Sequence, residues 1–393
     1  MSLGSILFQL PFHAPLVTIP CMNELHHRAI AIDLHADTVQ RLVDEDFDIS
    51  LRHTDGHLDA PRMREGGLDA QFFSIWVEPQ YFGTGGPTAV ARADKQIAAI
   101  RALPEKYPET WELATTAADI RRIVAQGKLA ALMGLEGGYA IDERLENVRK
   151  YYDLGVRYMS AAWSYSVSWA GSSNDEAGQT RGLNDFGREV IHEMNRLGMM
   201  VDVSHVSDKT FWDIIEVSDR PVIASHSNAR ALCRHQRNLT DDQIRAIGMR
   251  GGVMCAVFYN GFLDDDWSRE KDRVDAEIAP LLAELAANTD GSPLQKYLAT
   301  EPVRMKILAE RTTPLPIARV VDHIDHFVNL AGVECVGLGS DYDGIPAAPQ
   351  GLDDVSQLPN LTAELLRRGY SATDVEKILG GNVLRVLATV TGA

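Results

Sequence analysis

Short, nearly continuous apolar runs recur along the chain and alternate with longer segments of helical periodicity. Such runs are typical of parallel strands that helices cover on both faces. Eight candidate strands follow from the pattern: Ala29–His35, Ala70–Val77, Leu129–Leu135, Val156–Trp163, Met199–Ser204, Pro221–Ser225, Gly252–Phe258 and Cys335–Gly339. The segments between them predict helices, for example over Pro87–Ala102 and Asn184–Leu197. Eight strands that alternate with helices predict an α/β fold, a (β/α)8 TIM-like barrel.

Two segments exceed what a minimal barrel needs. Phe47–Ala70 is a polar loop region after the first strand, and Tyr259–Val320 is a long insertion between the seventh and eighth strands. A segment as long as Tyr259–Val320 usually carries helices of its own and often forms a lid or a subunit contact. We expect residues 1–28 to be an N-terminal extension and residues 29–393 to be a single barrel domain.

Composition narrows the class of protein. A net charge of −17 argues against a nucleic-acid partner, because nothing would offset the repulsion of phosphates. The four cysteines lie far apart without a C-x-x-C motif, so a disulfide framework or zinc knuckle is not expected. Ile6–Pro20 contains three prolines and no basic region, and no later run reaches 18 apolar residues. We therefore expect a cytoplasmic protein without membrane insertion.

Metal-type ligands follow the ends of four predicted strands. These residues are His35 and Asp37 after the first strand, Glu136 after the third, and His205 and His226 after the fifth and sixth. Active sites of this fold lie at the C-terminal ends of the strands. Imidazole and carboxylate suit zinc or a similar divalent ion, and Glu136 could give one oxygen to each of two ions. The pattern predicts two divalent metal ions, with zinc as the expected metal, that share a hydroxide and polarise a carbonyl.

Asp341 follows the eighth strand, within Gly339–Gly344. Beside a two-metal site its carboxylate could act as a general acid/base. It could take a proton from the bridging water and hand it to the leaving amine. The flanking glycines allow a tight turn that presents the carboxylate. Asp33, Asp202 and Asp343 are weaker candidates, for which supporting or structural roles are expected.

Six motifs occur in a recognisable order: Ile32–Asp37, Gly134–Gly138, Met194–Met199, Val201–Ser207, Ser225–Ser227 and Gly339–Gly344. Together they resemble the membrane (renal) dipeptidase family, metallopeptidase family M19, among the amidohydrolase-like barrels. The resemblance implies a binuclear zinc hydrolase that cleaves dipeptides and often tolerates a D-residue on the C-terminal side. It places His35, Asp37 and Glu136 on one metal, and Glu136, His205 and His226 on the other. Asp341 matches the family's general acid/base.

The same resemblance suggests how a dipeptide would be held. Arg237, in Gln236–Leu239, matches the arginine that receives the free carboxylate of the substrate. A bidentate contact between arginine and carboxylate suits a peptidase restricted to dipeptides. Arg230 is a nearby competitor, although the Arg-Asn pair favours Arg237. Tyr259 could line the substrate pocket, and a homodimer is expected from the family and the long insertion.

One position departs from the family pattern. Family members usually carry a histidine at the end of the fourth strand, near the scissile carbonyl, where this chain has Trp163. Indole can donate one N–H but cannot carry a charge. Loss of an oxyanion donor costs roughly 10²–10³ in rate. Trp163 could substitute in part as a donor, reshape the pocket or mark a different substrate.

The leading hypothesis is hydrolysis of a dipeptide with the substrate carboxylate on Arg237. A first alternative keeps the metals but changes the substrate to another small amide, such as an N-acyl amino acid or a lactam, and Trp163 is the feature that favours it. A second alternative is a non-catalytic metal-binding barrel. The full ligand set and Asp341 argue against a scaffold, which has no use for a proton shuttle.

Overall fold

The strands close into one parallel barrel. The computed structural model describes residues 19–392, and it contains the strands β1 (Ala31–Ala36), β2 (Leu68–Trp76), β3 (Trp111–Leu113), β4 (Leu129–Glu136), β5 (Val156–Ser160), β6 (Met200–Asp202), β7 (Val222–Ala224), β8 (Val253–Ala256) and β9 (Val336–Leu338). Their order is β2-β1-β9-β8-β7-β6-β5-β4, and pairing of β2 with β4 closes a ring of eight. The predicted (β/α)8 barrel is confirmed.

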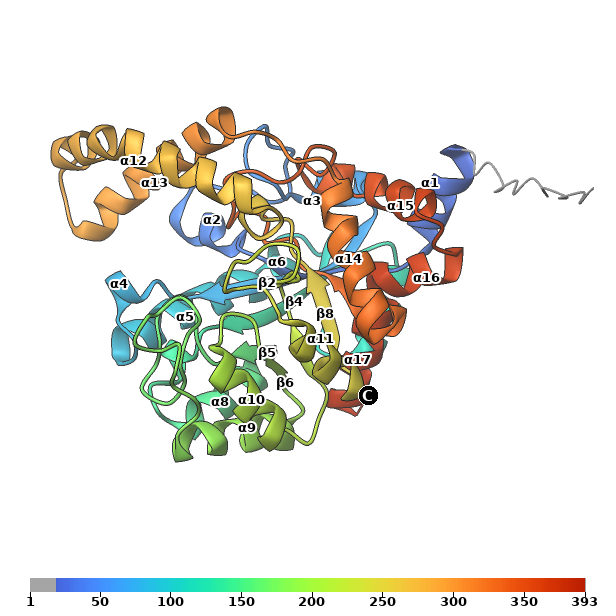
Figure 1. Cartoon of the computed structure of the whole chain (residues 1–393), viewed down its shortest axis with the longest axis horizontal. Coiled ribbons are helices and arrows are strands. Elements are labelled where there is room, and N and C mark those ends of the chain that lie inside the picture. The colour runs from blue at the N-terminus through green and yellow to red at the C-terminus, as the bar shows by residue number, and fades with distance from the viewer. Residues whose placement is uncertain (1–18, 393) are drawn as a thin grey trace, which may run out of the picture.

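Helices surround this barrel (Figure 1). They are α1 (Ile19–Arg28), α2 (Val39–Asp44), α3 (Ala60–Glu65), α4 (Pro79–Phe82), α5 (Pro87–Arg101), α6 (Leu103–Lys106), α7 (Ala117–Ala125), α8 (Leu145–Leu154), α9 (Asp185–Leu197), α10 (Asp208–Val217), α11 (Asp241–Met249), α12 (Asp265–Asn288), α13 (Pro293–Arg311), α14 (Ala318–Ala331), α15 (Pro359–Arg367), α16 (Ala372–Glu376) and α17 (Asn382–Thr391). Five short helical turns complete the set: η1 (Gly138–Ile141), η2 (Asn260–Phe262), η3 (Val333–Cys335), η4 (Val355–Gln357) and η5 (Lys377–Gly381). No helix of the described part is long and apolar enough to cross a membrane.

Several strands end earlier than the apolar runs suggest. The observed β5, β6, β7 and β9 stop before the predicted ends Trp163, Ser204, Ser225 and Gly339. At β6 and β7 the cause is a side chain, because the Asp202 carboxylate accepts the backbone N–H groups of Ser204 and Ser225. These two groups therefore do not continue the ladder. The short strand β3, which pairs with the start of β4, was not predicted, since three residues give too short a pattern.

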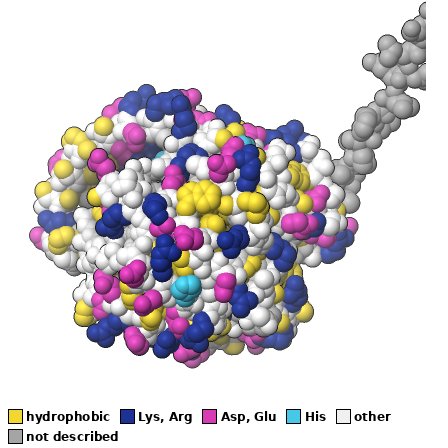
Figure 2. Space-filling view, turned by 60° about the horizontal axis from the view of Figure 1, so that its bottom comes forward, with side chains coloured by type: hydrophobic (Ala, Val, Ile, Leu, Met, Phe, Trp, Pro, Cys, Tyr) yellow, Lys and Arg dark blue, Asp and Glu magenta, His cyan; other side chains and the backbone are white. Residues whose placement is uncertain are grey.

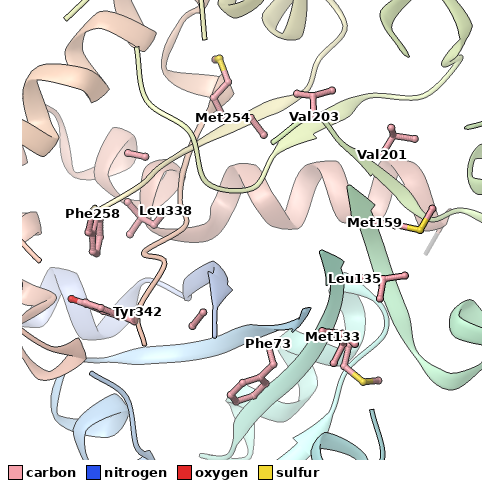
Figure 3. Close-up of a cluster of buried hydrophobic side chains, with 14 of the residues drawn as sticks. Phe73, Met133, Leu135, Met159, Val201, Val203, Met254, Phe258, Leu338 and Tyr342 are labelled. Atoms are coloured by element: carbon pink, nitrogen blue, oxygen red, sulfur yellow. The ribbon is translucent and has the colours of Figure 1, made fainter. Parts of the chain in front are cut away.

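Side chains inside the barrel form a core separate from the one under the helices. Phe72 and Tyr158 belong to the inner cluster, which apolar residues of α7 and α17 also join. A Cβ atom on Gly134 would lie 1.9 Å from the ring of Tyr158, so only glycine leaves room for that ring. Alternate residues of the strands face outward, and Figure 3 shows Met133 and Leu135 in the outer cluster. The alternation leaves Gly134 and Glu136 facing inward.

The long insertion forms a helical hairpin of α12 and α13, which project together from the barrel (Figure 1). It has a small core of its own made by Val274, Ile278 and Leu308. Tyr297 of α13 packs against Tyr81 of α4, with ring centroids 5.2 Å apart. The expectation of helices in this segment is met, while its role as a subunit contact stays a prediction.

Charged side chains of both signs are interspersed on the face shown in Figure 2. Many charged side chains of the described residues form ion pairs, as Arg368 does with Asp322, Asp325 and Glu364. The excess of acidic residues is therefore spread out on this face and does not gather in one place.

Candidate active site

The ligand-type residues predicted from the sequence meet at the C-terminal end of the barrel. Glu136 is the last residue of β4, and His35 is the next to last of β1. Asp37, His205, His226 and Asp341 lie in the loops that follow β1, β6, β7 and β9. The six residues come from the ends of five strands, and closure of the barrel brings these ends together.

Glu136 lies between the histidines, with a different oxygen facing each side. Its Oε2 is 3.3 Å from His35 Nε2. Its Oε1 is 2.8 Å from His205 Nε2 and 3.7 Å from His226 Nε2. A carboxylate placed in this way is suited to bridge two cations.

Two sets of three ligand atoms share Glu136: His35 with Asp37, and His205 with His226. Within each set the ligand atoms lie within 4.8 Å of one another, as they do in a third set of His35, His226 and Asp341. His35 Nε2 and Asp37 Oδ1 are buried without a hydrogen-bond partner among the described residues. Buried polar atoms without partners are rare in proteins. Nitrogen and carboxylate oxygen donors left open in this way fit a divalent metal such as zinc.

Other buried residues orient these ligands. Tyr158 places its hydroxyl 2.8 Å from His35 Nδ1, which leaves Nε2 directed at the cluster. Ser225 Oγ lies 2.8 Å from His226 Nδ1, and Ser74 Oγ donates to Glu136 Oε2 at 2.7 Å. Sequence reasoning missed these three residues. For Ser74 a signal was present, because it lies two residues before the end of β2 on the face that points inward.

The side chains of the cluster shift one another's pKa values in opposite directions. Burial opposes the charge of His35, but the Glu136, Asp37 and Asp341 carboxylates raise its pKa to about 10. Burial would also raise the pKa of Glu136, yet His35 and His205 hold it well below its usual range. Burial and the nearby Arg237 lower the pKa of His205 to about 3. His205 is therefore neutral at physiological pH, which is the form in which imidazole binds metals.

Asp341 faces the same cluster, with Oδ1 3.9 Å from His35 Nε2. Burial raises the pKa of its carboxyl to about 6, although His35 counteracts the shift. Its backbone has a φ of 64°, and that of His205 has a φ of 73°, both in the left-handed region. For residues other than glycine this conformation costs about 1–3 kcal/mol and is typical of functional sites. A Cβ on Gly344 would lie 2.1 Å from Asp37 Oδ2, so glycine lets this turn approach the cluster.

Arg237 is a buried cation beside the cluster. It donates to the His226 carbonyl at 3.2 Å and lies over the ring of Phe262. In residues 19–392 no acidic side chain lies within ion-pair distance of it, and its Nε has no partner. Arg230, the competing candidate, is half-buried and forms a bidentate pair with Asp208 at 2.8 and 2.9 Å. Of these two arginines, Arg237 is the one whose guanidinium lacks an acidic partner among the described residues and could therefore receive a carboxylate.

Trp163 and Tyr259 lie on different sides of this end of the barrel. Trp163, in the loop after β5, has its ring centroid 6.2 Å from that of His205 and 4.9 Å from that of Trp76. Tyr259 follows β8 and packs edge-on against Phe262 and Trp267, where the insertion begins. Sequence reasoning did not include Trp76, the last residue of β2, among the site residues.

A closed parallel barrel with a cluster of histidines and carboxylates at its C-terminal end defines the class of metal-dependent hydrolase barrels. The profile of one family, described as membrane dipeptidase (peptidase family M19), matches residues 21–393. The chain belongs to this family. The predicted family is confirmed, and so is the predicted class of enzyme, a hydrolytic dipeptidase.

Individual proteins agree with this membership. Dipeptidase tcpJ of Claviceps purpurea is 35% identical over 340 residues, which cover 85% of this chain and 69% of that protein. Dipeptidase 3 of Mus musculus is 35% identical over 348 residues, which cover 87% of this chain and 60% of the mouse protein. This chain therefore spans less than two thirds of the mouse relative.

Two solved structures share the fold over nearly the whole chain. The probable dipeptidase PvdM from Pseudomonas aeruginosa is 26% identical with a TM-score of 0.81, over 96% of this chain and all of that one. A metallopeptidase from Rhodobacter sphaeroides is 28% identical with a TM-score of 0.74, over 92% of this chain and 99% of that one. The second was solved with a phosphinate mimic of the dipeptide L-Ala-D-Ala.

Proposed function

We propose that this protein is a dipeptidase that uses two divalent metal ions, with zinc as the expected metal. The observation that carries the proposal is the position of Glu136, whose two oxygens lie 3.3 Å from His35 Nε2 and 2.8 Å from His205 Nε2. His35, Asp37 and Glu136 would hold one ion. Glu136, His205 and His226 would hold the other. When bound, such a pair polarises a carbonyl and generates a nucleophile from water at neutral pH.

Arg237 would select the substrate by its free carboxylate. Its guanidinium is buried and lacks an acidic partner among the described residues, so a carboxylate that enters the site would satisfy its charge. A bidentate contact fixes both the position and the direction of the substrate. A peptide with more than one residue after the scissile bond would have to place the extra residues where this carboxylate sits, so Arg237 would limit the C-terminal side of the substrate to one residue.

Asp341 would move the proton. Its Oδ1 is 3.9 Å from His35 Nε2, so the carboxylate lies next to the residues that would hold the metal ions. An unprotonated Asp341 can accept the proton of the attacking water, and the protonated form can donate it to the leaving amine. A pKa near 6, raised by burial, keeps both forms accessible near neutral pH.

The proposal includes the stereochemistry of the substrate, for which a relative gives support. The Rhodobacter sphaeroides metallopeptidase was solved with a mimic of L-Ala-D-Ala. Because that protein aligns with 92% of this chain, a C-terminal D-residue is a reasonable substrate feature here. We expect L-D dipeptides to be hydrolysed as well as L-L dipeptides.

A second candidate function is hydrolysis of another small amide, such as an N-acyl amino acid or a lactam. The observation that favours it is Trp163, whose indole lies near His205 and packs on Trp76. The two aromatic rings make this side of the site bulky and apolar, where the family usually offers a charged donor.

A library of L-L and L-D dipeptides, tested beside small amides with zinc-loaded protein and its Trp163→His variant, separates the two functions. Turnover of dipeptides by the parent protein is the expected result. Dipeptide turnover by the variant alone, with amide turnover by the parent, would instead support the second function.

A further inference from the structure

Two buried aspartates join the strand ends that carry the site residues. We infer that Asp33 and Asp202 are positioning residues: each holds a pair of neighbouring strand ends in place and thereby sets how tightly the site binds its divalent metal ions. This inference rests on the proposed two-metal function. The evidence is a set of hydrogen bonds that the two residues share.

Asp202 joins the loops that carry His205 and His226. Its Oδ1 accepts the backbone N–H groups of Ser204 and Ser225, each at 2.9 Å. Its Oδ2 accepts the hydroxyl of Ser225 at 2.6 Å. Because Ser204 and Ser225 directly precede the two histidines, one carboxylate fixes the backbone before both.

Asp33 repeats the arrangement between β1 and β9. Its Oδ1 accepts the backbone N–H groups of His35 and Ser340, at 3.2 and 2.8 Å. Its Oδ2 accepts the hydroxyl of Ser340 at 2.5 Å. Here the carboxylate fixes His35 itself and the backbone just before Asp341. Each aspartate therefore accepts hydrogen bonds from the same kinds of donors, namely two backbone N–H groups and one serine hydroxyl.

Neither aspartate has a lysine or arginine as an ion-pair partner among the described residues, and the charge of His35 offsets only part of the effect of burial, so the pKa of both carboxyls stays raised. They are 4% and 1% exposed, and within residues 19–392 no Lys or Arg lies within ion-pair distance of either one. Both lie near the thiol of Cys255 in the barrel interior, where they help burial to raise its pKa. A buried charge that is only partly offset is costly, and a link between strands alone would not require one. Cations bound above the two carboxylates would offset this cost.

Asp202 also determines which nitrogen of His226 is free. Ser225 donates its only hydroxyl proton to Asp202 at 2.6 Å, since its other acceptor, Ser204 Oγ, is 3.3 Å away. The His226 Nδ1 that faces Ser225 Oγ at 2.8 Å must therefore donate its N–H. The lone pair is then on Nε2, the atom that faces Glu136. Partners of this kind fix the tautomer of metal-binding histidines.

An Asp202→Asn substitution would reverse the direction of the hydrogen bonds that run from His226 through Ser225 to residue 202. The amide N–H would donate to Ser225 Oγ, and the serine proton would turn toward His226 Nδ1. His226 would then carry its hydrogen on Nε2, where it blocks a metal. Asp33→Asn lacks this effect on a tautomer and would act through the backbone of His35 and Ser340.

Zinc titration of the metal-free full chain against a chromophoric chelator tests the inference. In Asp202→Asn we expect one of two zinc equivalents to bind about 10–100-fold more weakly, and in Asp33→Asn a weakening confined to the other equivalent. The matched control is Asp69→Asn. Asp69 also accepts a backbone N–H across strands, from Ala31 at 3.0 Å, but at the amino-terminal end of β2. Its variant should bind both equivalents as the parent does.

Substitutions at Ser225 keep the test decisive if an aspartate variant fails to fold. Ser225→Thr retains the hydroxyl and should retain zinc affinity, whereas Ser225→Ala should lose it. Unchanged affinity in both aspartate variants, or an equal loss in Asp69→Asn, would overturn the inference. A parent that binds a single zinc ion would refute the two-metal proposal instead, and the same comparison would then decide the inference for that ion.

Discussion

Replacement of Arg237 by methionine tests how the substrate is recognised. The guanidinium is buried and still charged at neutral pH, since burial lowers its pKa only to about 10. A bidentate contact with a carboxylate makes two hydrogen bonds to charged groups, each worth about 1.5–3 kcal/mol. The loss of both is about 3–6 kcal/mol, which corresponds to a fall of about 10²–10⁴-fold in kcat/KM.

The assay compares a dipeptide with the same dipeptide amidated at its C-terminus, which lacks the carboxylate. The parent protein should strongly prefer the free acid, and Arg237→Met should cleave both forms at similar low rates. Arg230→Met is the matched control, because Arg230 is held by Asp208 and should not contact substrate. An equal loss on both substrates in Arg237→Met, with the preference for the free acid retained, would refute this role.

Three further changes have defined outcomes. Asp341→Asn should lose about 10³-fold or more in kcat with its metals retained, and near-normal turnover in a steady-state assay would reject the proton shuttle. Gly134→Ala should lower the free energy of unfolding by about 1–3 kcal/mol or more, because its Cβ would lie 1.9 Å from the Tyr158 ring; an unchanged urea midpoint would show that the barrel interior adapts. Tyr158→Phe should weaken zinc binding about 10–100-fold, because it loses the contact with His35. If the variant and the parent bind zinc equally in a chelator competition, that contact does not contribute to zinc affinity.

The barrel was predictable because its strands are buried on both faces. Continuous apolar runs such as Leu129–Leu135 mark such strands without any alignment, and four of the eight runs end in or are followed directly by metal-type ligands. The length of each strand was harder to predict. Where a side chain such as Asp202 takes over the backbone N–H groups, an apolar run continues past the end of the ladder.

The partners that orient the ligands were not predictable in the same way. Tyr158 on β5 reaches His35 on β1, and these strands are not neighbours in the sheet. Their contact exists only because the barrel closes and Gly134 leaves space for the tyrosine ring. Likewise, the choice between Arg230 and Arg237 depended on which one has an acidic partner, and that is a property of the folded chain.

The central claim is a dipeptidase with two metal ions held on either side of Glu136. The most direct test is to titrate metal-free protein with zinc while hydrolysis of a dipeptide is followed. Turnover should rise until two equivalents per chain are bound and then level off. A plateau at one equivalent, or the absence of dipeptide turnover in the fully loaded protein, would contradict it.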